Sequence, residues 1–114
     1  MSRAAVLSVL TAAALGVAAT AGAGQSAEVK KGMEVYNAQH CSLCHSINGK
    51  GNAKGSLDDV GTKLKPEEIR EWIVNPKEMT TKTKATRKPP MKQYNLPKED
   101  VDALVAYIQT LKKK

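Results

Sequence analysis

The stretch HCSLCHSINGKG, residues 40–51, contains both cysteines and both histidines of this 114-residue chain. Cys41 and Cys44 are three positions apart, so their sulfur atoms lie about one helical turn from each other. His45 follows the second cysteine directly. The spacing of these three side chains therefore decides what the cluster can bind.

The pattern C-x-x-C-H is the attachment signature of c-type haem. Two thiols at this spacing can form thioethers with the two vinyl groups on one edge of the porphyrin, and the next residue projects its imidazole towards the iron. We therefore expect one covalently bound haem c with its iron. Cys41 and Cys44 would hold the haem, and His45 would be one axial ligand.

Three other interpretations of a C-x-x-C pair compete with haem. A thioredoxin-like dithiol needs a βαβ pattern, which the sequence does not show. Half of a zinc site would need two more ligands, and His40 is the only other histidine. The third is a simple disulfide in an exported protein. Shuffling this composition would produce the pentapeptide in only about one of three thousand trials, so the specific haem signature is preferred.

The sixth iron ligand decides whether such a protein carries electrons or binds and activates small molecules. His40 adjoins Cys41 and cannot easily reach the opposite face of a haem. Methionine remains, and Met33 is expected to fill core or surface space on a helix face. Met91 follows two prolines that stiffen the backbone, so it is the preferred ligand, and Met79 is the second candidate.

The beginning of the chain differs in composition from the rest. Residues 4–24 carry no charge, and small residues offer cleavage sites of the A-x-A kind. We predict a signal peptide over residues 1–27, with cleavage after Ala27 favoured and cleavage after Ala23 second. The rival prediction is an uncleaved N-terminal membrane anchor, because the uncharged run is about as long as the roughly 20 residues of a membrane span. Its richness in alanine makes it a weak span.

The charge of the chain indicates its partners. The formal net charge is +7, and residues 79–98 contain six basic residues and no acidic one. Basic proteins bind acidic surfaces. Nucleic acid is excluded as the expected partner, because an exported chain rarely meets it and the sequence has no recognised nucleic-acid motif. We expect acidic redox proteins as partners of a monomer, and no small-molecule substrate.

The pattern of apolar residues predicts three main helices. The first covers about residues 28–39, the second runs from Pro66 to Asn75, and the last follows Glu99 and carries the clearest apolar stripe: Val101, Leu104, Val105, Ile108 and Leu111. A glycine-rich winding loop follows the cysteines, and residues 79–98 are predicted to form a loop. The chain has no Phe, so a bulky apolar cofactor would help to fill its small core.

Three segments in order show a family resemblance: GMEVYNAQHCSLCHSINGKG, LDDVGTKLKPEEIREWIVNPK and KPPMKQYNLPKEDVDALVAYIQTL. Through them the whole of residues 28–114 resembles the class I mono-haem cytochromes c of the small bacterial periplasmic kind. The resemblance implies an all-α fold, with about three main helices wrapped around one haem and the N- and C-terminal helices crossing. Gly32 and Tyr36 would then meet the last helix near Leu104 and Tyr107.

The resemblance also implies roles for single residues. It makes Met91 the distal ligand and places Trp72 near the haem propionates. Gly55 stands where the family often has a proline whose carbonyl accepts a hydrogen bond from the proximal imidazole, and that carbonyl remains available. Lys92 follows Met91, where the family often has another proline.

Ligation by histidine and methionine implies a function. It raises the haem potential and keeps both iron states six-coordinate, which suits outer-sphere electron transfer. We expect a periplasmic electron carrier and no enzyme. The alternative is a haem enzyme or gas sensor with an open sixth site. A solvated loop is usually charged, which is the alternative explanation for the basic residues of this segment. We assign docking onto acidic partners to five of them around the haem edge: Lys82, Lys84, Arg87, Lys88 and Lys92.

Overall fold

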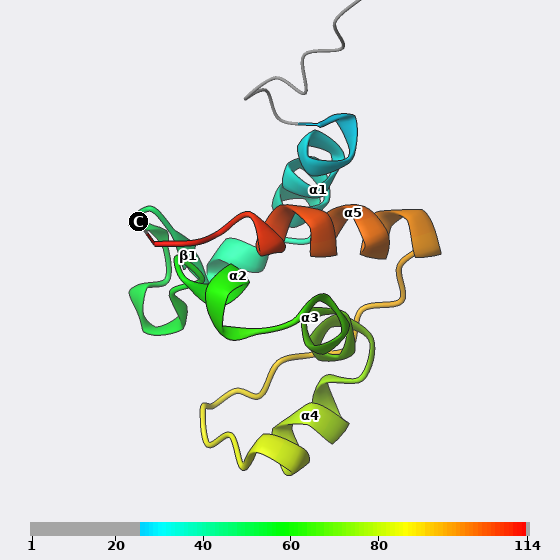
Figure 1. Ribbon diagram of the computed structural model, residues 1–114. Helices are drawn as coiled ribbons and strands as arrows, with labels where there is room; N and C mark the ends of the chain where they lie inside the picture. Colours follow the sequence, from blue (N-terminus) through cyan, green and yellow to red (C-terminus); the bar gives the residue numbers. More distant parts are fainter. Residues whose placement is uncertain (1–25, 114) are drawn as a thin grey trace, which may run out of the picture.

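The computed structural model describes residues 26–113 (Figure 1). Most of the predicted signal peptide, with the Ala23 cleavage site, lies outside the described residues, and cleavage after Ala27 stays a prediction. Within the described part of the chain, no helix is both long and apolar enough to cross a membrane.

Most elements of the structure are α-helices: α1 (Ala27–Ala38), α2 (Val60–Lys63), α3 (Pro66–Val74), α4 (Pro76–Thr83) and α5 (Lys98–Gln109). Short 3-10 helices, η1 (Cys41–Leu43) and η2 (Ala53–Gly55), flank a hairpin of the two-residue strands β1 (Ser46–Ile47) and β2 (Lys50–Gly51). The all-α class is confirmed, and α1, α3 and α5 are the three predicted main helices.

Helices α1 and α5 cross in close contact. A Cβ atom added to Gly32 would collide with the backbone carbonyl of Ala103 and would lie 2.6 Å from Cβ of Tyr107. One turn further along α1, the Tyr36 ring meets the Tyr107 ring edge to face, with 5.9 Å between the centroids. The predicted crossing of the first and last helices is therefore confirmed, with Gly32 at its closest point.

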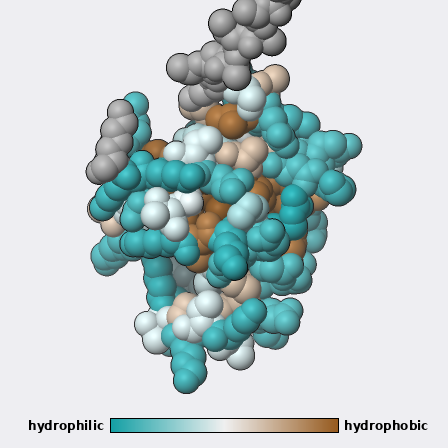
Figure 2. Space-filling view, viewed as in Figure 1, coloured by the Kyte–Doolittle hydropathy of each residue, from teal (hydrophilic) through white to brown (hydrophobic). Residues whose placement is uncertain are grey.

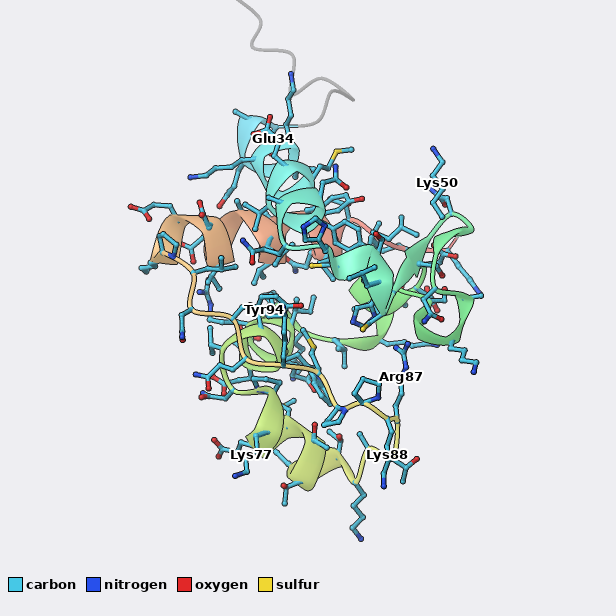
Figure 3. The ribbon with its side chains drawn as sticks, turned by 180° about the vertical axis from the view of Figure 1, so that it is seen from behind. Glu34, Lys50, Lys77, Arg87, Lys88 and Tyr94 are labelled. Atoms are coloured by element: carbon cyan, nitrogen blue, oxygen red, sulfur yellow. The ribbon has the colours of Figure 1, made fainter. Side chains whose placement is uncertain are left out.

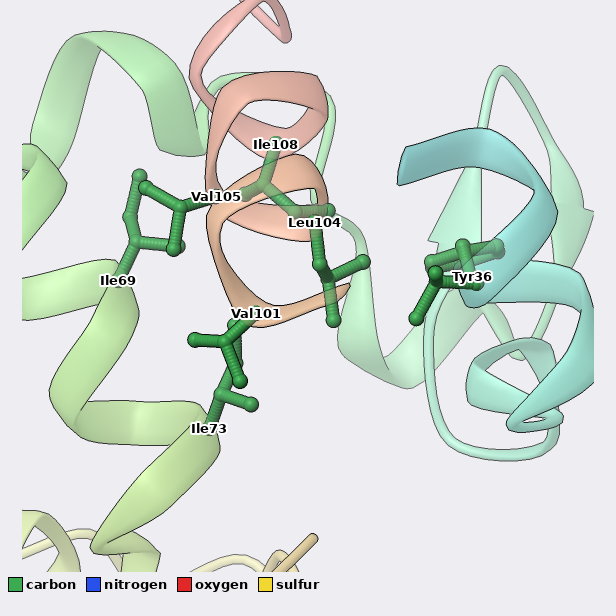
Figure 4. Packing of buried hydrophobic residues seen from close by; sticks show 8 residues of the cluster. Tyr36, Ile69, Ile73, Val101, Leu104, Val105 and Ile108 are labelled. Carbon is green, nitrogen blue, oxygen red and sulfur yellow. The ribbon is translucent and has the colours of Figure 1, made fainter. Parts of the chain in front are cut away.

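The core lies where α1 and α3 pack on opposite sides of α5. In Figure 4, Ile69 and Ile73 of α3 face Val105 and Val101 of α5, while Leu104 is directed towards α1. The buried cluster consists of Val35, Tyr36, Ile69, Ile73, Val101, Leu104, Val105 and Ile108. Figure 2 shows that apolar residues still reach the surface between polar ones, so this small core is not fully covered.

The prediction of a loop over residues 79–98 is wrong for its first part, because residues 79–83 belong to α4. Pro76, which ends α3, also occupies the first position of α4, where its missing N–H is not needed. The hydroxyl groups of the α4 threonines donate to carbonyls four residues earlier. Met79 is therefore buried on a helix, and α4 ends at Lys84 in a left-handed conformation.

The winding loop after the cysteines contains more regular structure than predicted. Ser46 pairs with Gly51 and Ile47 with Lys50 in the antiparallel hairpin. The turn between the strands has positive φ at Asn48 (50°) and Gly49 (78°), the geometry that tight two-residue hairpins require.

The contact at Gly32 yields a stability prediction. Gly32→Ala should destabilise the protein by about 2 kcal/mol, because overpacking against the α5 backbone outweighs the better helix propensity of alanine. Urea unfolding measures the change. Glu34→Ala on the exposed side of the same helix is the control and should change the free energy of unfolding by less than about 0.5 kcal/mol. A Gly32→Ala protein as stable as the wild type would contradict the close crossing.

Candidate haem site

Cys41 begins η1 and Cys44 caps its end, and two residues separate η1 from the end of α1. His40 has a φ of 56° and turns the chain out of α1. The amide of Cys44 donates to the carbonyl of Cys41 (3.1 Å), and the amide of His45 donates to the same carbonyl (2.9 Å). This tight turn brings the two thiols and the imidazole into one short, fixed segment.

Both thiols are free, but their surroundings differ. Cys44 is exposed, whereas Cys41 is half-buried. Burial is the main cause that raises the pKa of Cys41 to about 11, although the positive charge of Lys92 acts in the opposite direction. The cysteine edge of the site therefore lies partly in the interior and partly in solvent.

The imidazole of His45 is oriented by the backbone. Its Nδ1 lies 3.0 Å from the carbonyl oxygen of Gly55, so Nδ1 donates and Nε2 keeps its lone pair. Burial lowers the pKa of His45, which favours the neutral form that ligates metals. The carbonyl predicted to hold the proximal imidazole is therefore confirmed as its partner.

The backbone explains why residue 55 is glycine. A Cβ atom at Gly55 would collide with the carbonyl oxygen of Cys44 and with the guanidinium group of Arg87. Asn52 also ties this loop to η1, because its backbone amide donates to the carbonyl of His45 (2.9 Å) and its side-chain amide donates to the carbonyl of Leu43 (3.2 Å). The loop is therefore fastened to the cysteine segment and does not need a proline to stiffen it.

The segment that carries Met91 lies close to the cysteines. Met91 is half-buried and packs against the core cluster. The amide of Tyr94 donates to the carbonyl of Ile73 on α3 (3.4 Å). The pKa of Tyr94 is raised mainly by burial and further by Cys41 and Cys44, which agrees with its inward position in Figure 3.

The other methionines and the remaining predicted site residues are placed as follows. Met79 is buried on α4, and Met33 is half-buried on α1. Trp72 is half-buried on α3, and its contact with haem propionates stays a prediction, as does the ligand role of Met91 with Met79 second. His40 is exposed and lies on the turn before η1.

Tyr36 adds a feature that the sequence did not reveal at this site. Its hydroxyl group is buried and has no hydrogen-bond partner among residues 26–113. Burial, followed by Cys41 and Tyr107, raises its pKa to about 12. The interior next to the cysteines thus has an unsatisfied polar atom and an incomplete core. Together with two free thiols and an imidazole whose Nε2 is available, this environment fits a haem.

Comparison with known proteins identifies a family. Residues 29–112 match the family model described as cytochrome c, which covers more than half of the chain. Neither the search of curated proteins nor the search of solved structures found a match. The matched family binds covalently attached haem c with its iron, and Cys41 and Cys44 are consistent with an attachment of the C-x-x-C-H type.

The contact at residue 55 yields a second prediction. Gly55→Ala should push the carbonyl away from His45 and weaken the hold of His45 on the iron by about tenfold, the lower range for losing a partner of a metal-bound histidine. The NMR signal of the Nδ1 proton in the reduced, haem-bound protein and the urea concentration that displaces His45 both report this change.

Gly49→Ala is the matched control, because Gly49 has a φ of 78° but open space around its Cβ position. It should cost about 1 kcal/mol of stability through backbone strain and leave the Nδ1 proton signal unchanged. Equal effects of the two substitutions on that signal would contradict the role assigned to the Gly55 carbonyl.

Proposed function

Because the chain belongs to the cytochrome c family, a family of haem-binding electron-transfer proteins, we propose that it is a periplasmic carrier of single electrons with His45 and Met91 as axial ligands. The observation that carries the proposal is the His45–Gly55 hydrogen bond, which holds an imidazole ready on the cysteine segment. When bound, the haem supplies an iron that accepts and releases one electron.

The residues around His45 fix the proximal side. The Gly55 carbonyl accepts from Nδ1, so the ring keeps one tautomer and presents Nε2. The carbonyl of His45 is itself bonded to the amide of Asn52. Because both the ring and its backbone are anchored, few atoms need to move when the charge of the site changes.

Two observations support Met91 on the distal side. It packs against the same core cluster as Cys41, and the amide of Tyr94, three residues later, donates to the carbonyl of Ile73 on α3 (3.4 Å), which holds this segment beside the core. A neutral thioether favours the reduced iron and raises the potential. Met79 is buried on α4 and does not belong to the core cluster that Met91 packs against, so it stays the second candidate for the ligand role.

Electrons would pass through the exposed cysteine edge. Cys44 is exposed, so a partner can approach one attachment point directly. Outer-sphere transfer makes no bond to a substrate and needs no catalytic acid, base or nucleophile. The five basic residues assigned to docking are all exposed, which leaves them free to meet an acidic partner: Lys82, Lys84, Arg87, Lys88 and Lys92.

The periplasmic location rests on the composition of residues 1–27. Ser26 lies between the two candidate cleavage sites. Its side chain accepts from the amide of Val29 (3.2 Å) and caps α1. A mature chain cut after Ala23 keeps this cap, whereas one cut after Ala27 loses it, and the mass of the mature chain distinguishes the two.

The ligand assignment yields a third prediction, with Met91→Ala and Met79→Ala compared. Met91→Ala should abolish the methionine-to-iron charge-transfer band of the oxidised protein and lower the reduction potential, because the thioether is lost. Met79→Ala should keep the band and lose roughly 2–5 kcal/mol of stability, because it leaves a cavity. Optical spectra, redox titration and urea unfolding measure the three quantities.

Two results would contradict this assignment. Loss of the band in Met79→Ala, together with a normal spectrum in Met91→Ala, would show that Met79 and not Met91 is the ligand. A high-spin spectrum of the oxidised wild-type protein would show an open sixth site and favour a haem enzyme or gas sensor.

The basic docking residues yield a fourth prediction. The rate of electron exchange with an acidic plastocyanin should fall about tenfold from low to physiological ionic strength, because salt screens the steering charges. Lys88→Gln should lower the rate at low salt, and Lys30→Gln on α1 is the control with the same loss of charge. A rate that does not depend on salt would rule out electrostatic docking.

A further inference from the structure

The guanidinium group of Arg87 occupies the space that a side chain at residue 55 would need. A Cβ atom on Gly55 would lie 3.0 Å from Cζ of Arg87 and closer still to its Nη1 atom. Figure 3 shows the Arg87 side chain reaching from its own segment towards the loop that follows the cysteines. The carbonyl of Gly55 accepts from Nδ1 of His45 (3.0 Å). Arg87 therefore packs against the backbone that orients the imidazole.

The segment that carries Arg87 and Met91 is fastened by its backbone only at its two ends. The amide of Ala85 donates to the carbonyl of Thr80 on α4 (3.0 Å), and the amide of Tyr94 donates to the carbonyl of Ile73 on α3 (3.4 Å). Between these points, residues 86–93 form no backbone–backbone hydrogen bond within residues 26–113. The position of this stretch therefore depends on its side chains, of which Met91 packs against the core and Arg87 against Gly55.

The charge of Arg87 acts on the same site. A guanidinium group is always positive in proteins, and within residues 26–113 no carboxylate forms an ion pair with Arg87. Asp58, the acidic residue nearest to Gly55 in sequence, accepts instead from the amide of Asn48 (2.7 Å). Burial is the main cause that lowers the pKa of His45, and the charge of Arg87 acts in the same direction, although the hydrogen bond to Gly55 opposes it.

We propose that Arg87 is a positioning residue that joins the segment of Met91 to the loop that orients His45. Through this one contact, the two sides of the haem site would hold each other in place. This inference rests on the proposed electron-carrier function with His45 and Met91 as ligands, and it gives Arg87 a role within the site in addition to docking. An unpaired positive charge beside His45 would also favour reduced iron, because oxidised iron carries one more positive charge.

The first test is amide hydrogen exchange in the haem-bound, reduced protein, followed by NMR. The amide of Gly55, which donates to the carbonyl of Asn52 (3.1 Å), reports on the His45 loop, and the amide of Tyr94 reports on the Met91 segment. Arg87→Gln should speed exchange about tenfold at both amides, because local opening of either side becomes easier. Lys77→Gln, which removes the same charge from an exposed position on α4, is the matched control and should change neither.

The second test is the reduction potential. Arg87→Gln should lower the ratio of reduced to oxidised protein at a fixed electrode potential about threefold, or about 28 mV for one electron. The shift is small because Arg87 is exposed and solvent screens its charge. Arg87→Lys keeps the charge but loses the planar group, so it should restore the ratio while exchange at Gly55 stays faster than in the wild type. Lys77→Gln should leave the ratio at the wild-type value.

Four results would overturn the proposal. Wild-type exchange at both amides in Arg87→Gln would remove the joining role and leave the carrier function intact. Faster exchange at only one amide would reduce Arg87 to a local contact. An equal potential shift in Lys77→Gln would show that net charge, and not the position of Arg87, sets the potential. Absence of the methionine-to-iron band, or of reversible one-electron uptake, in the wild-type protein would refute the ligand set or the carrier function on which the inference rests.

Discussion

The close crossing of α1 and α5 determines the rest of the structure. Only a residue without a side chain fits between the α1 backbone and the carbonyl of Ala103, and Gly32 fills that position. The crossing holds α1 against α5, and the left-handed turn at His40 then leads into η1, whose Cys41 packs against the core. The contact between α1 and α5 takes no direct part in haem binding. It nevertheless positions the two cysteines, because their segment follows α1 in the sequence.

The small core explains why a cofactor belongs to this fold. The chain has no Phe, and no large side chain in residues 26–113 is completely buried. The Tyr36 hydroxyl is buried without a partner in the same region. A domain of this size buries little apolar surface, so an apolar macrocycle beside the cysteines would supply core volume as well as redox chemistry.

The sequence predicted the features that depend on local rules. The helices α1, α3 and α5 follow from apolar periodicity, and the Gly55 carbonyl followed from the family resemblance. Helix α4 was missed because a proline such as Pro76 can either end one helix or begin the next. Lysine and threonine dominate α4, so no apolar stripe marks it, and only Met79 is a buried side chain after its first position. The unpartnered hydroxyl of Tyr36 depends on packing between distant residues, which no local pattern reveals.

One segment connects the loop that holds His45 with the core and with basic residues assigned to docking. Between Lys84 and Pro97 the chain brings Arg87 against the proximal loop at Gly55, packs Met91 on the core, and fastens Tyr94 to α3 through the carbonyl of Ile73. The same segment carries Arg87, Lys88 and Lys92, three of the five basic residues assigned to docking. Lys92, one of the charges that would attract a partner, is thus the neighbour in sequence of Met91, which would ligate the iron. Because this segment is tied at Ile73 and rests against the core, we expect that a partner bound to it would leave the site intact.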